Sequence, residues 1–107
     1  MSNAVELTTT NFEATVLQSP KPFLVDFWAS WCGPCRAVSP IVDQIAAEKS
    51  DIISVGKLNV DEQNEIAQRY RVMSIPTLIL FKDGEAAAVS IGAASKEEIL
   101  KRLEPYF

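Results

Sequence analysis

Residues 28–36 read Trp28-Ala29-Ser30-Trp31-Cys32-Gly33-Pro34-Cys35-Arg36. This segment carries both cysteines of the chain, and it lies between an apolar run and a long helical pattern. Pro34 suits the first turn of a helix, because the N–H that proline lacks would have no partner inside the helix there. The segment therefore predicts a strand-to-helix turn with Cys32 at the helix N-terminus, at the carboxyl end of a strand, where open α/β sheets place their sites.

The position of Cys32 predicts two unequal thiols. Unpaired N–H groups and the positive end of the helix dipole stabilise a thiolate at a helix N-terminus, so we expect the pKa of Cys32 to lie below the ~8.5 of free cysteine. Cys35 lies about one turn further along the helix. We expect Cys35 to be more buried than Cys32 and to stay protonated until it reacts. Cys32 is therefore predicted to attack a substrate disulfide, and Cys35 to resolve the mixed disulfide.

Strand and helix patterns alternate along the rest of the chain. The apolar run over residues 23–29 is typical of a buried strand, and the apolar stripe over residues 38–46 predicts a helix that Pro40 should kink. Asp83-Gly84 predicts a two-residue hairpin turn. The other elements are expected at residues 8–17 (a helix capped by Thr10 and Glu13), 52–60 (a strand), 61–70 (a helix), 77–81 and 86–91 (strands), and from Ser95 onward (a helix capped by Ser95 and Glu98).

This order predicts one α/β domain over residues 1–107, with a central mixed β-sheet flanked by helices on both faces and residues 1–5 as a flexible N-terminus. With 48% hydrophobic residues, a chain of this length can bury a core without a structural metal. The net charge of -4 and the lack of a basic run argue against nucleic acid as a partner. The sequence has no signal-peptide pattern and no apolar run of ~18 residues, so we expect a cytoplasmic protein without a membrane partner.

The chain has two cysteines and no histidine, which excludes further reaction classes. A cysteine protease needs an imidazole to activate its thiol. An ordinary zinc site needs four ligands, of which one cysteine pair supplies two, so no metal is expected. A purely structural cysteine pair remains the alternative to a redox pair.

The segment around the cysteines closely resembles the thioredoxins when it is taken together with Asp26, Lys57 and Ile75-Pro76-Thr77. The resemblance runs from about residue 8 to residue 103 without insertions, and it implies the thioredoxin fold. Asp26 interrupts an apolar strand, where desolvation should raise its pKa. In thioredoxins the matching Asp handles the proton of the resolving thiol and the matching Lys tunes that carboxylate, which implies these roles for Asp26 and Lys57. An ordinary surface position for Lys57 remains the alternative.

The resemblance also implies a substrate groove beside the cysteines. Thioredoxins hold the bond that matches Ile75–Pro76 in the cis form, facing the disulfide, so a cis bond is expected at Pro76. Trp28 ends a core strand and is expected to pack there rather than to touch substrate. The residues expected to line the groove with Pro76 are Trp31, Gly33, Pro34, Met73, Ser74, Ile75, Gly92 and Ala93.

By resemblance, the chain is a general disulfide reductant that passes two electrons to oxidised target proteins through transient mixed disulfides. It would bind no cofactor and act as a monomer, and it would receive electrons from NADPH through a flavoprotein thioredoxin reductase. Oxidising relatives carry a His between the cysteines, whereas this chain has Gly33-Pro34. We therefore predict a reduction potential close to that of thioredoxin, about -270 mV, rather than to that of protein disulfide isomerase, about -180 mV. Two alternatives stay open, namely a binding module without redox function and a dimer bridged by a metal cluster.

Overall fold

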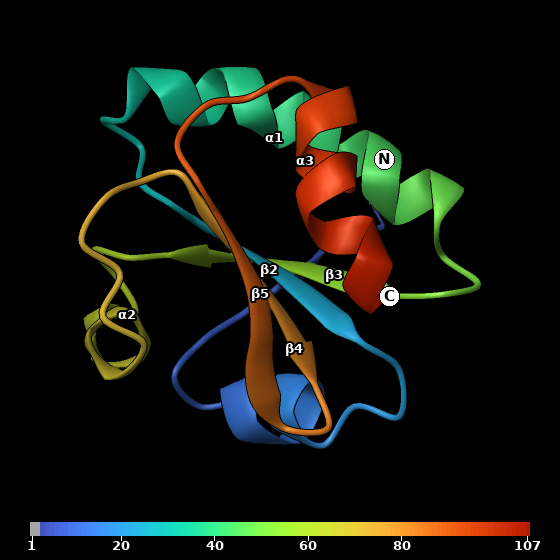
Figure 1. Cartoon of the computed structure of the whole chain (residues 1–107). Helices are drawn as coiled ribbons and strands as arrows, with labels where there is room; N and C mark the ends of the chain where they lie inside the picture. The colour runs from blue at the N-terminus through green and yellow to red at the C-terminus, as the bar shows by residue number, and fades with distance from the viewer. Residues whose placement is uncertain (1–2) are drawn as a thin grey trace.

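The sheet is built around β2 (Phe23–Trp28), the apolar strand that leads into the cysteine segment. The computed structural model, which describes residues 3–107, places five strands in the order β1-β3-β2-β4-β5 (Figure 1). β2 pairs in parallel with β3 and antiparallel with β4. The other strands are β1 (Val5–Glu6), β3 (Ser54–Asn59), β4 (Thr77–Lys82) and β5 (Glu85–Ile91). The predicted mixed sheet is confirmed.

Helices cover both faces of this sheet, as predicted (Figure 1). One face carries α1 (Gly33–Glu48) and α3 (Lys96–Leu103), which lie above the sheet in Figure 1. The opposite face carries the short π-helix η1 (Glu13–Leu17) and α2 (Asn64–Arg69). A 3-10 turn, η2 (Glu104–Tyr106), follows α3.

Alternation along β2 separates two hydrophobic cores. Phe23, Val25 and Phe27 point to the face covered by η1 and α2, whereas Leu24 packs with residues of α1 and α3. Successive side chains of a strand point to opposite faces, so Asp26 lies on the same face as Leu24, toward α1. The same alternation in β3 places Lys57 on the face of Val55, which also packs toward α1.

An aromatic cluster anchors the core on the other face. Phe12, Tyr70 and Phe81 have ring centroids 4.9–5.7 Å apart, in tilted and edge-to-face arrangements. Such pairs contribute about 0.5–1.5 kcal/mol each beyond the area that they bury. This cluster therefore stabilises the sheet from the side away from Asp26.

The capping box predicted at Thr10 and Glu13 is wrong. The backbone N–H of Thr8 donates to Asn11 Oδ1 at 2.8 Å, and the N–H of Asn11 donates to Thr8 Oγ1 at 3.1 Å. This reciprocal pair begins the turn, and η1 then follows Phe12 without a side-chain cap. The helix, Glu13–Leu17, is shorter than predicted, and the turn formed by Thr8 and Asn11 precedes it.

Strand β1 was not predicted. Val5 and Glu6 pair in parallel with Gly56 and Lys57 of β3, and a two-residue strand has too little alternation to show in a sequence. The flexible N-terminus predicted over residues 1–5 includes residues 1–2, which lie outside the described residues, and its other end, Val5, is in β1.

Leu7, which follows β1, is fully buried over Gly56. A Cβ atom on Gly56 would lie 2.6 Å from Leu7 Cδ1, so this close approach requires glycine.

The turn and cap predicted in the C-terminal half are confirmed. Asp83 and Gly84 have φ values of 54° and 81°, as a two-residue turn between antiparallel strands requires. The Ser95 side chain accepts the N–H of Glu98 at 3.1 Å and begins α3. Pro40 lies inside α1, and the kink expected there stays a prediction.

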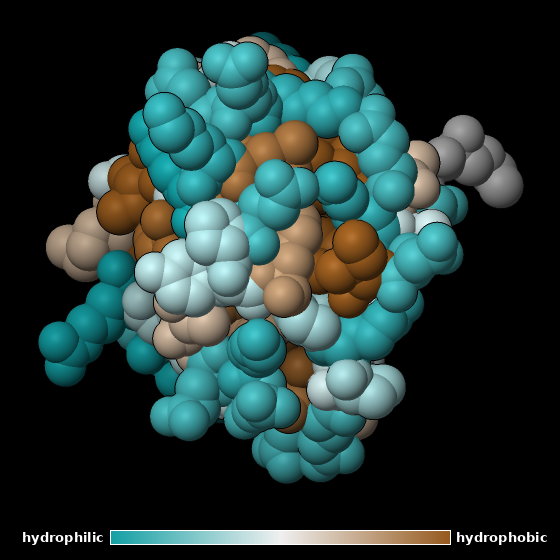
Figure 2. Space-filling view, turned by 45° about the vertical axis from the view of Figure 1, so that its right-hand side comes forward, coloured by the Kyte–Doolittle hydropathy of each residue, from teal (hydrophilic) through white to brown (hydrophobic). Residues whose placement is uncertain are grey.

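Among residues 3–107, seven large hydrophobic side chains remain exposed. Figure 2 shows hydrophobic residues reaching the surface in separate patches bordered by hydrophilic ones. The exposed side chains are Val5, Trp31, Ile52, Met73, Val89, Ile91 and Tyr106. Trp31 and Met73 are the most exposed of these, at 68% and 92%, and both belong to the predicted groove.

Candidate active site

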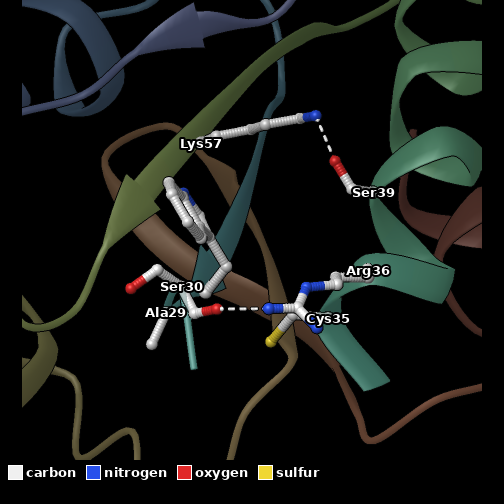
Figure 3. A pocket seen from close by; sticks show the side chains of 7 residues that line it. Ala29, Ser30, Cys35, Arg36, Ser39 and Lys57 are labelled. Atoms are coloured by element: carbon white, nitrogen blue, oxygen red, sulfur yellow. Dashed lines mark hydrogen bonds between the residues drawn. The ribbon is translucent and has the colours of Figure 1, made fainter. Parts of the chain in front are cut away.

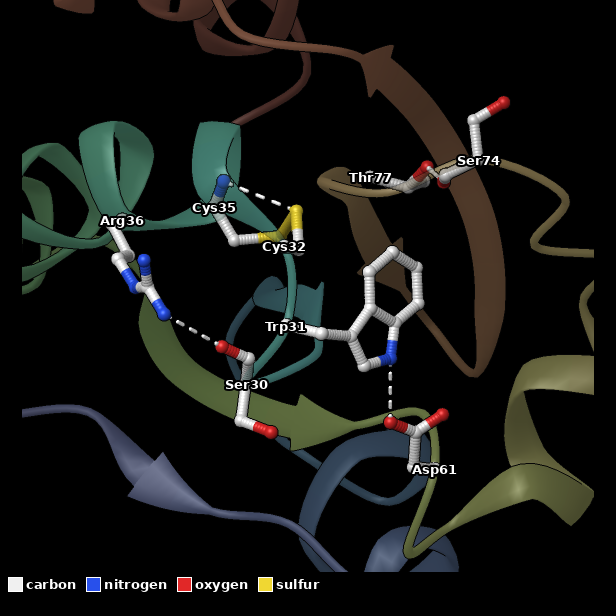
Figure 4. Close-up of a disulfide and its surroundings, with 8 residues drawn as sticks. All are labelled: Ser30, Trp31, Cys32, Cys35, Arg36, Asp61, Ser74 and Thr77. Carbon is white, nitrogen blue, oxygen red and sulfur yellow. Dashed lines mark hydrogen bonds between the residues drawn. A yellow bond between two sulfur atoms is a disulfide. The ribbon is translucent and has the colours of Figure 1, made fainter.

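Cys32 is the N-cap residue of α1, and Pro34 lies in the first turn, as the sequence predicted. The two cysteines form a disulfide with their Cα atoms 5.3 Å apart (Figure 4). The backbone N–H of Cys35 donates to Cys32 Sγ at 3.2 Å. A hydrogen bond from the backbone favours negative charge on a sulfur atom at this position, together with the helix dipole. The geometry thus provides for a thiolate on Cys32.

The prediction that Cys35 is more buried than Cys32 is wrong for this disulfide form. Cys32 is 3% exposed and Cys35 is 4% exposed. Both are covered because Trp28, Val60 and Ile75 pack against the pair. The difference between the two cysteines lies in the hydrogen bond to Cys32 Sγ rather than in exposure.

Asp26, in β2, is buried with only 2% of its surface exposed. Within residues 3–107, its Oδ1 atom has no hydrogen-bond partner. Burial raises the pKa of Asp26 from 3.8 to about 7, while the positive charge of Lys57 lowers it and the negative charge of Asp43 raises it further. Near neutral pH, Asp26 is therefore able to both accept and release a proton.

Lys57 is the register partner of Asp26 in the neighbouring strand. Its Nζ donates to Ser39 Oγ at 2.6 Å (Figure 3). The same Nζ lies 2.8 Å from Asp43 Oδ1. The Lys57 side chain is 22% exposed, so it is not an ordinary surface lysine. Its charge acts on Asp26 through space, while its contacts are made with α1.

A pocket of about 390 Å³ adjoins Lys57 and Cys35. Figure 3 shows that side chains from β3 and α1 border it. Arg36 folds across one side, where its guanidinium donates to the Ser30 carbonyl at 3.0 Å. The other lining residues are Trp28, Ala29 and Ser39. Trp28, predicted only to pack, thus both contacts the cysteine pair and lines this pocket.

A second hollow measures about 340 Å³, and two of its lining residues, Val60 and Ile75, also pack against the cysteine cluster. It brings together Trp31 and the segment 73–75, which were predicted to share a groove. Val60 and Val72 complete it, and neither was predicted. The indole N–H of Trp31 donates to Asp61 Oδ2 at 2.8 Å, which holds the ring beside the disulfide (Figure 4). Asp61 was also missed, since it carries no motif and lies 30 positions from Trp31.

The Ile75–Pro76 bond is cis, as predicted. Ile75 packs against the cysteine pair, and the backbone N–H of Gly92 donates to the Pro76 carbonyl at 2.8 Å. Gly92 has a φ of 87°, which favours glycine. The predicted residues Gly33, Pro34 and Ala93 are exposed, and their contact with substrate stays a prediction.

The family model described as Thioredoxin matches residues 3–105. The chain belongs to the thioredoxin family. It is 47% identical over 102 residues to a thioredoxin of Mycobacterium tuberculosis, covering 95% of this chain and 88% of the relative. It is 46% identical over 106 residues to thioredoxin 1 of Synechococcus elongatus, covering 99% of each chain. It is also 46% identical over 99 residues to a bifunctional thioredoxin reductase/thioredoxin of Mycobacterium leprae, covering 92% of this chain and 22% of that protein.

As a thioredoxin whose two cysteines form a disulfide, this protein is a dithiol–disulfide oxidoreductase. The predicted family, fold and reaction class are confirmed. Within residues 3–107, no helix combines the length and apolar character needed to cross a bilayer. In the same part of the chain, no three His, Cys, Asp or Glu side chains converge as metal ligands.

Proposed function

We propose that this thioredoxin is a general protein-disulfide reductant of the cytoplasm that is recharged by an NADPH-linked flavoprotein thioredoxin reductase. The proposal rests on one observation above all, which is the hydrogen bond to Cys32 Sγ at the start of α1, beside an exposed apolar hollow. The relative from Mycobacterium leprae supports the reductase partner, because its name joins a thioredoxin to a thioredoxin reductase. In a reducing compartment, a pair of cysteines close together in the sequence is typically a redox-active pair rather than a structural disulfide.

In the first step, the Cys32 thiolate attacks one sulfur of a substrate disulfide. A bond forms between Cys32 Sγ and that sulfur, and the substrate S–S bond breaks. The electron pair leaves with the other substrate sulfur as a thiolate. The Cys35 N–H, already directed at Cys32 Sγ, stabilises the attacking anion without rearrangement of the backbone.

In the second step, Cys35 resolves the mixed disulfide. Ionised Asp26 accepts the proton of the Cys35 thiol, which its raised pKa permits near neutral pH. The Cys35 thiolate then attacks Cys32 Sγ, the mixed disulfide breaks, and the second substrate thiolate leaves. Two electrons have passed to the substrate, and the Cys32–Cys35 disulfide remains. The two sulfur atoms carry both electrons, so the reaction needs no bound cofactor.

The hollow beside the disulfide suits an extended polypeptide. Trp31 and Met73 supply exposed apolar surface, Ser74 lines the same hollow, and Ile75 packs against the cysteines. We assign substrate contact to these side chains and to the backbone around Pro76 and Gly92. The same role is proposed for the exposed residues Gly33 and Pro34, at the start of α1, and Ala93, which follows β5.

Turnover of insulin disulfides with NADPH and a thioredoxin reductase tests the proposal. We expect continuous NADPH oxidation that requires all three proteins and is lost in Cys32→Ser and Cys35→Ser. A parallel assay with dithiothreitol as the reductant separates the chemistry from the partner. If the protein accelerates insulin reduction by dithiothreitol but supports none with NADPH and the reductase, the reductase assignment is wrong. Full function of the Cys→Ser variants would favour the binding-module alternative. We also propose that the active form is a monomer, which the mass in solution checks.

A further inference from the structure

Two residues of α1 bind the ammonium group of Lys57. Ser39 and Asp43 lie four positions apart, so they share one face of the helix. Lys57 Nζ donates to Ser39 Oγ at 2.6 Å and lies 2.8 Å from Asp43 Oδ1. An ammonium group has three N–H donors, and this ammonium-binding pair (Ser39 and Asp43) engages two of them.

Asp26 competes for the same ammonium group. Asp26 and Lys57 are register partners whose side chains share the α1 face, and neighbouring strands lie only ~4.8 Å apart. Nevertheless, among the ion pairs of residues 3–107, Lys57 pairs with Asp43 and not with Asp26. In the same part of the chain, the Oδ1 atom of Asp26 has no hydrogen-bond partner. The direction that the flexible Lys57 side chain takes therefore decides whether Asp26 has a contact partner.

We propose that Ser39 and Asp43 hold the Lys57 ammonium out of contact with Asp26, and that they are positioning residues for the dithiol–disulfide exchange. The inference rests on the proposed role of Asp26 as the proton acceptor of Cys35. A direct ion pair with Lys57 would keep Asp26 ionised and unable to return a proton when the disulfide is reduced again. Because the ammonium-binding pair holds Lys57, the positive charge of Lys57 attracts the Asp26 carboxylate from a distance without forming an ion pair with it.

The charges that act on Asp26 are few. Lys57 on β3 lowers its pKa, and Asp43 on α1 raises it. From β4, the register partner of Asp26 is Leu78, which carries no charge. Arg36 borders the pocket near Cys35, where its guanidinium is bound to the Ser30 carbonyl. Changes at Asp43 therefore act on Asp26 in two ways, through the negative charge itself and through the position of Lys57.

The titration of Asp26, followed by the NMR signal of its carboxyl carbon, tests the inference in the disulfide form, where the cysteines do not titrate. Asp43→Asn removes a negative charge and frees Lys57 to approach Asp26, so the midpoint is expected to move to lower pH by about half a unit or more. Asp43→Glu is expected to restore most of the original midpoint. Ser39→Ala is expected to move the Asp26 midpoint in the same direction as Asp43→Asn, but by less. An unchanged midpoint in Ser39→Ala would mean that Ser39 does not help to position Lys57.

Glu48→Gln is the matched control. Glu48 is also on α1 and forms an ion pair of 2.6 Å with Lys96, so this change alters the net charge equally without touching Lys57. We expect no more than about a fifth of the effect of Asp43→Asn, because exposed charges are screened by solvent. Equal midpoints in the two variants would overturn the inference.

A double-mutant cycle separates position from charge. In a Lys57→Met background, Asp43→Asn is expected to move the Asp26 midpoint by less than half as much as in the wild type. An undiminished shift would show that Asp43 acts by its own charge alone, and the positioning role would be wrong. These titrations require no turnover, so a failure of the insulin assay would contradict the proposed function and leave the ammonium-binding pair intact.

Discussion

Asp26 and Lys57 extend from neighbouring strands toward the same helix, yet within the described part of the chain Lys57 forms its ion pair with Asp43. The carboxyl group of Asp26 is left buried, and its Oδ1 atom has no hydrogen-bond partner among the residues that the structure describes. Burial of this kind makes a carboxyl group hold its proton more tightly in the folded protein than in the unfolded chain. The stability of the protein therefore depends on pH through this residue.

The free energy of unfolding is expected to fall as pH rises from about 4 to about 7. The pKa of Asp26 rises from 3.8 unfolded to about 7 folded, so between these values the native state binds more protons than the unfolded state. Through Asp26 alone, the loss amounts to at most about 4 kcal/mol. Urea unfolding of the disulfide form at several pH values measures it. Asp26→Asn, compared at each pH, is expected to be a few kcal/mol more stable than the wild type at pH 8 and nearly equal at pH 4. A constant difference between the two proteins would contradict the raised pKa.

The two cysteines are expected to trap partners unequally. Cys35→Ser leaves Cys32 at the start of α1 able to form a mixed disulfide that cannot be resolved. Cys32→Ser leaves a thiol whose sulfur is not the acceptor of the N–H at that position. Incubation with oxidised insulin, followed by non-reducing electrophoresis, should show at least about ten times more adduct with Cys35→Ser. Equal amounts would mean that the assignment of attacking and resolving cysteine is wrong.

The reduction potential is expected to lie near about -270 mV, because no cation stands between the cysteines to stabilise the dithiol form. Equilibration with glutathione or with a reference thioredoxin measures this potential. Pro34→His places an imidazole beside Cys32 and is expected to raise the potential by tens of mV. A wild-type value near about -180 mV would overturn the assignment as a reductant.

Asp61 is expected to matter for substrate binding through Trp31. The 2.8 Å hydrogen bond between them holds an indole that is otherwise 68% exposed. Asp61→Ala should raise the KM for insulin about two- to tenfold with little change in kcat, since an exposed hydrogen bond to a charged group contributes about 1 kcal/mol. Glu62→Ala removes the adjacent exposed carboxylate and serves as the control. The same KM in both variants would argue against a role for the Trp31–Asp61 bond.

Gly56→Ala is expected to destabilise the fold by about 1–3 kcal/mol, because the added methyl group would overlap the buried Leu7 side chain. Gly33→Ala is the matched control, since a Cβ there meets no atom within 4 Å. Chemical denaturation of both variants compares them. Similar stabilities would show that Leu7 can move without cost.

Local patterns in the sequence predicted the parts of the fold that depend on neighbouring residues. The cap at Ser95, the turn at Asp83-Gly84 and the position of Cys32 each depend on a few adjacent positions, and all three are confirmed. Near η1, the hydrogen bonds that begin the turn are formed by Thr8 and Asn11, two positions before the predicted pair of Thr10 and Glu13.

Local sequence patterns did not predict the contacts between residues that lie far apart in the sequence. Asp61 reaches Trp31 across 30 positions, and Ser39 and Lys57 meet across 18. The equal burial of the cysteines likewise results from Val60 and Ile75, which come from two other segments. The sequence therefore predicted the position of the cysteine pair at the start of α1, but not which residues pack against it.

The aromatic cluster of Phe12, Tyr70 and Phe81 has a practical consequence for protein engineering. It lies across the sheet from Asp26, Lys57 and α1, but Val60 and Ile75 pack both against this core and against the cysteine cluster. Changes of ring size at these three positions are therefore expected to alter the resistance to heat with little effect on redox behaviour only where Val60 and Ile75 keep their places. Substitutions in this aromatic cluster are therefore a way to obtain a more stable or a more easily degraded version of this protein.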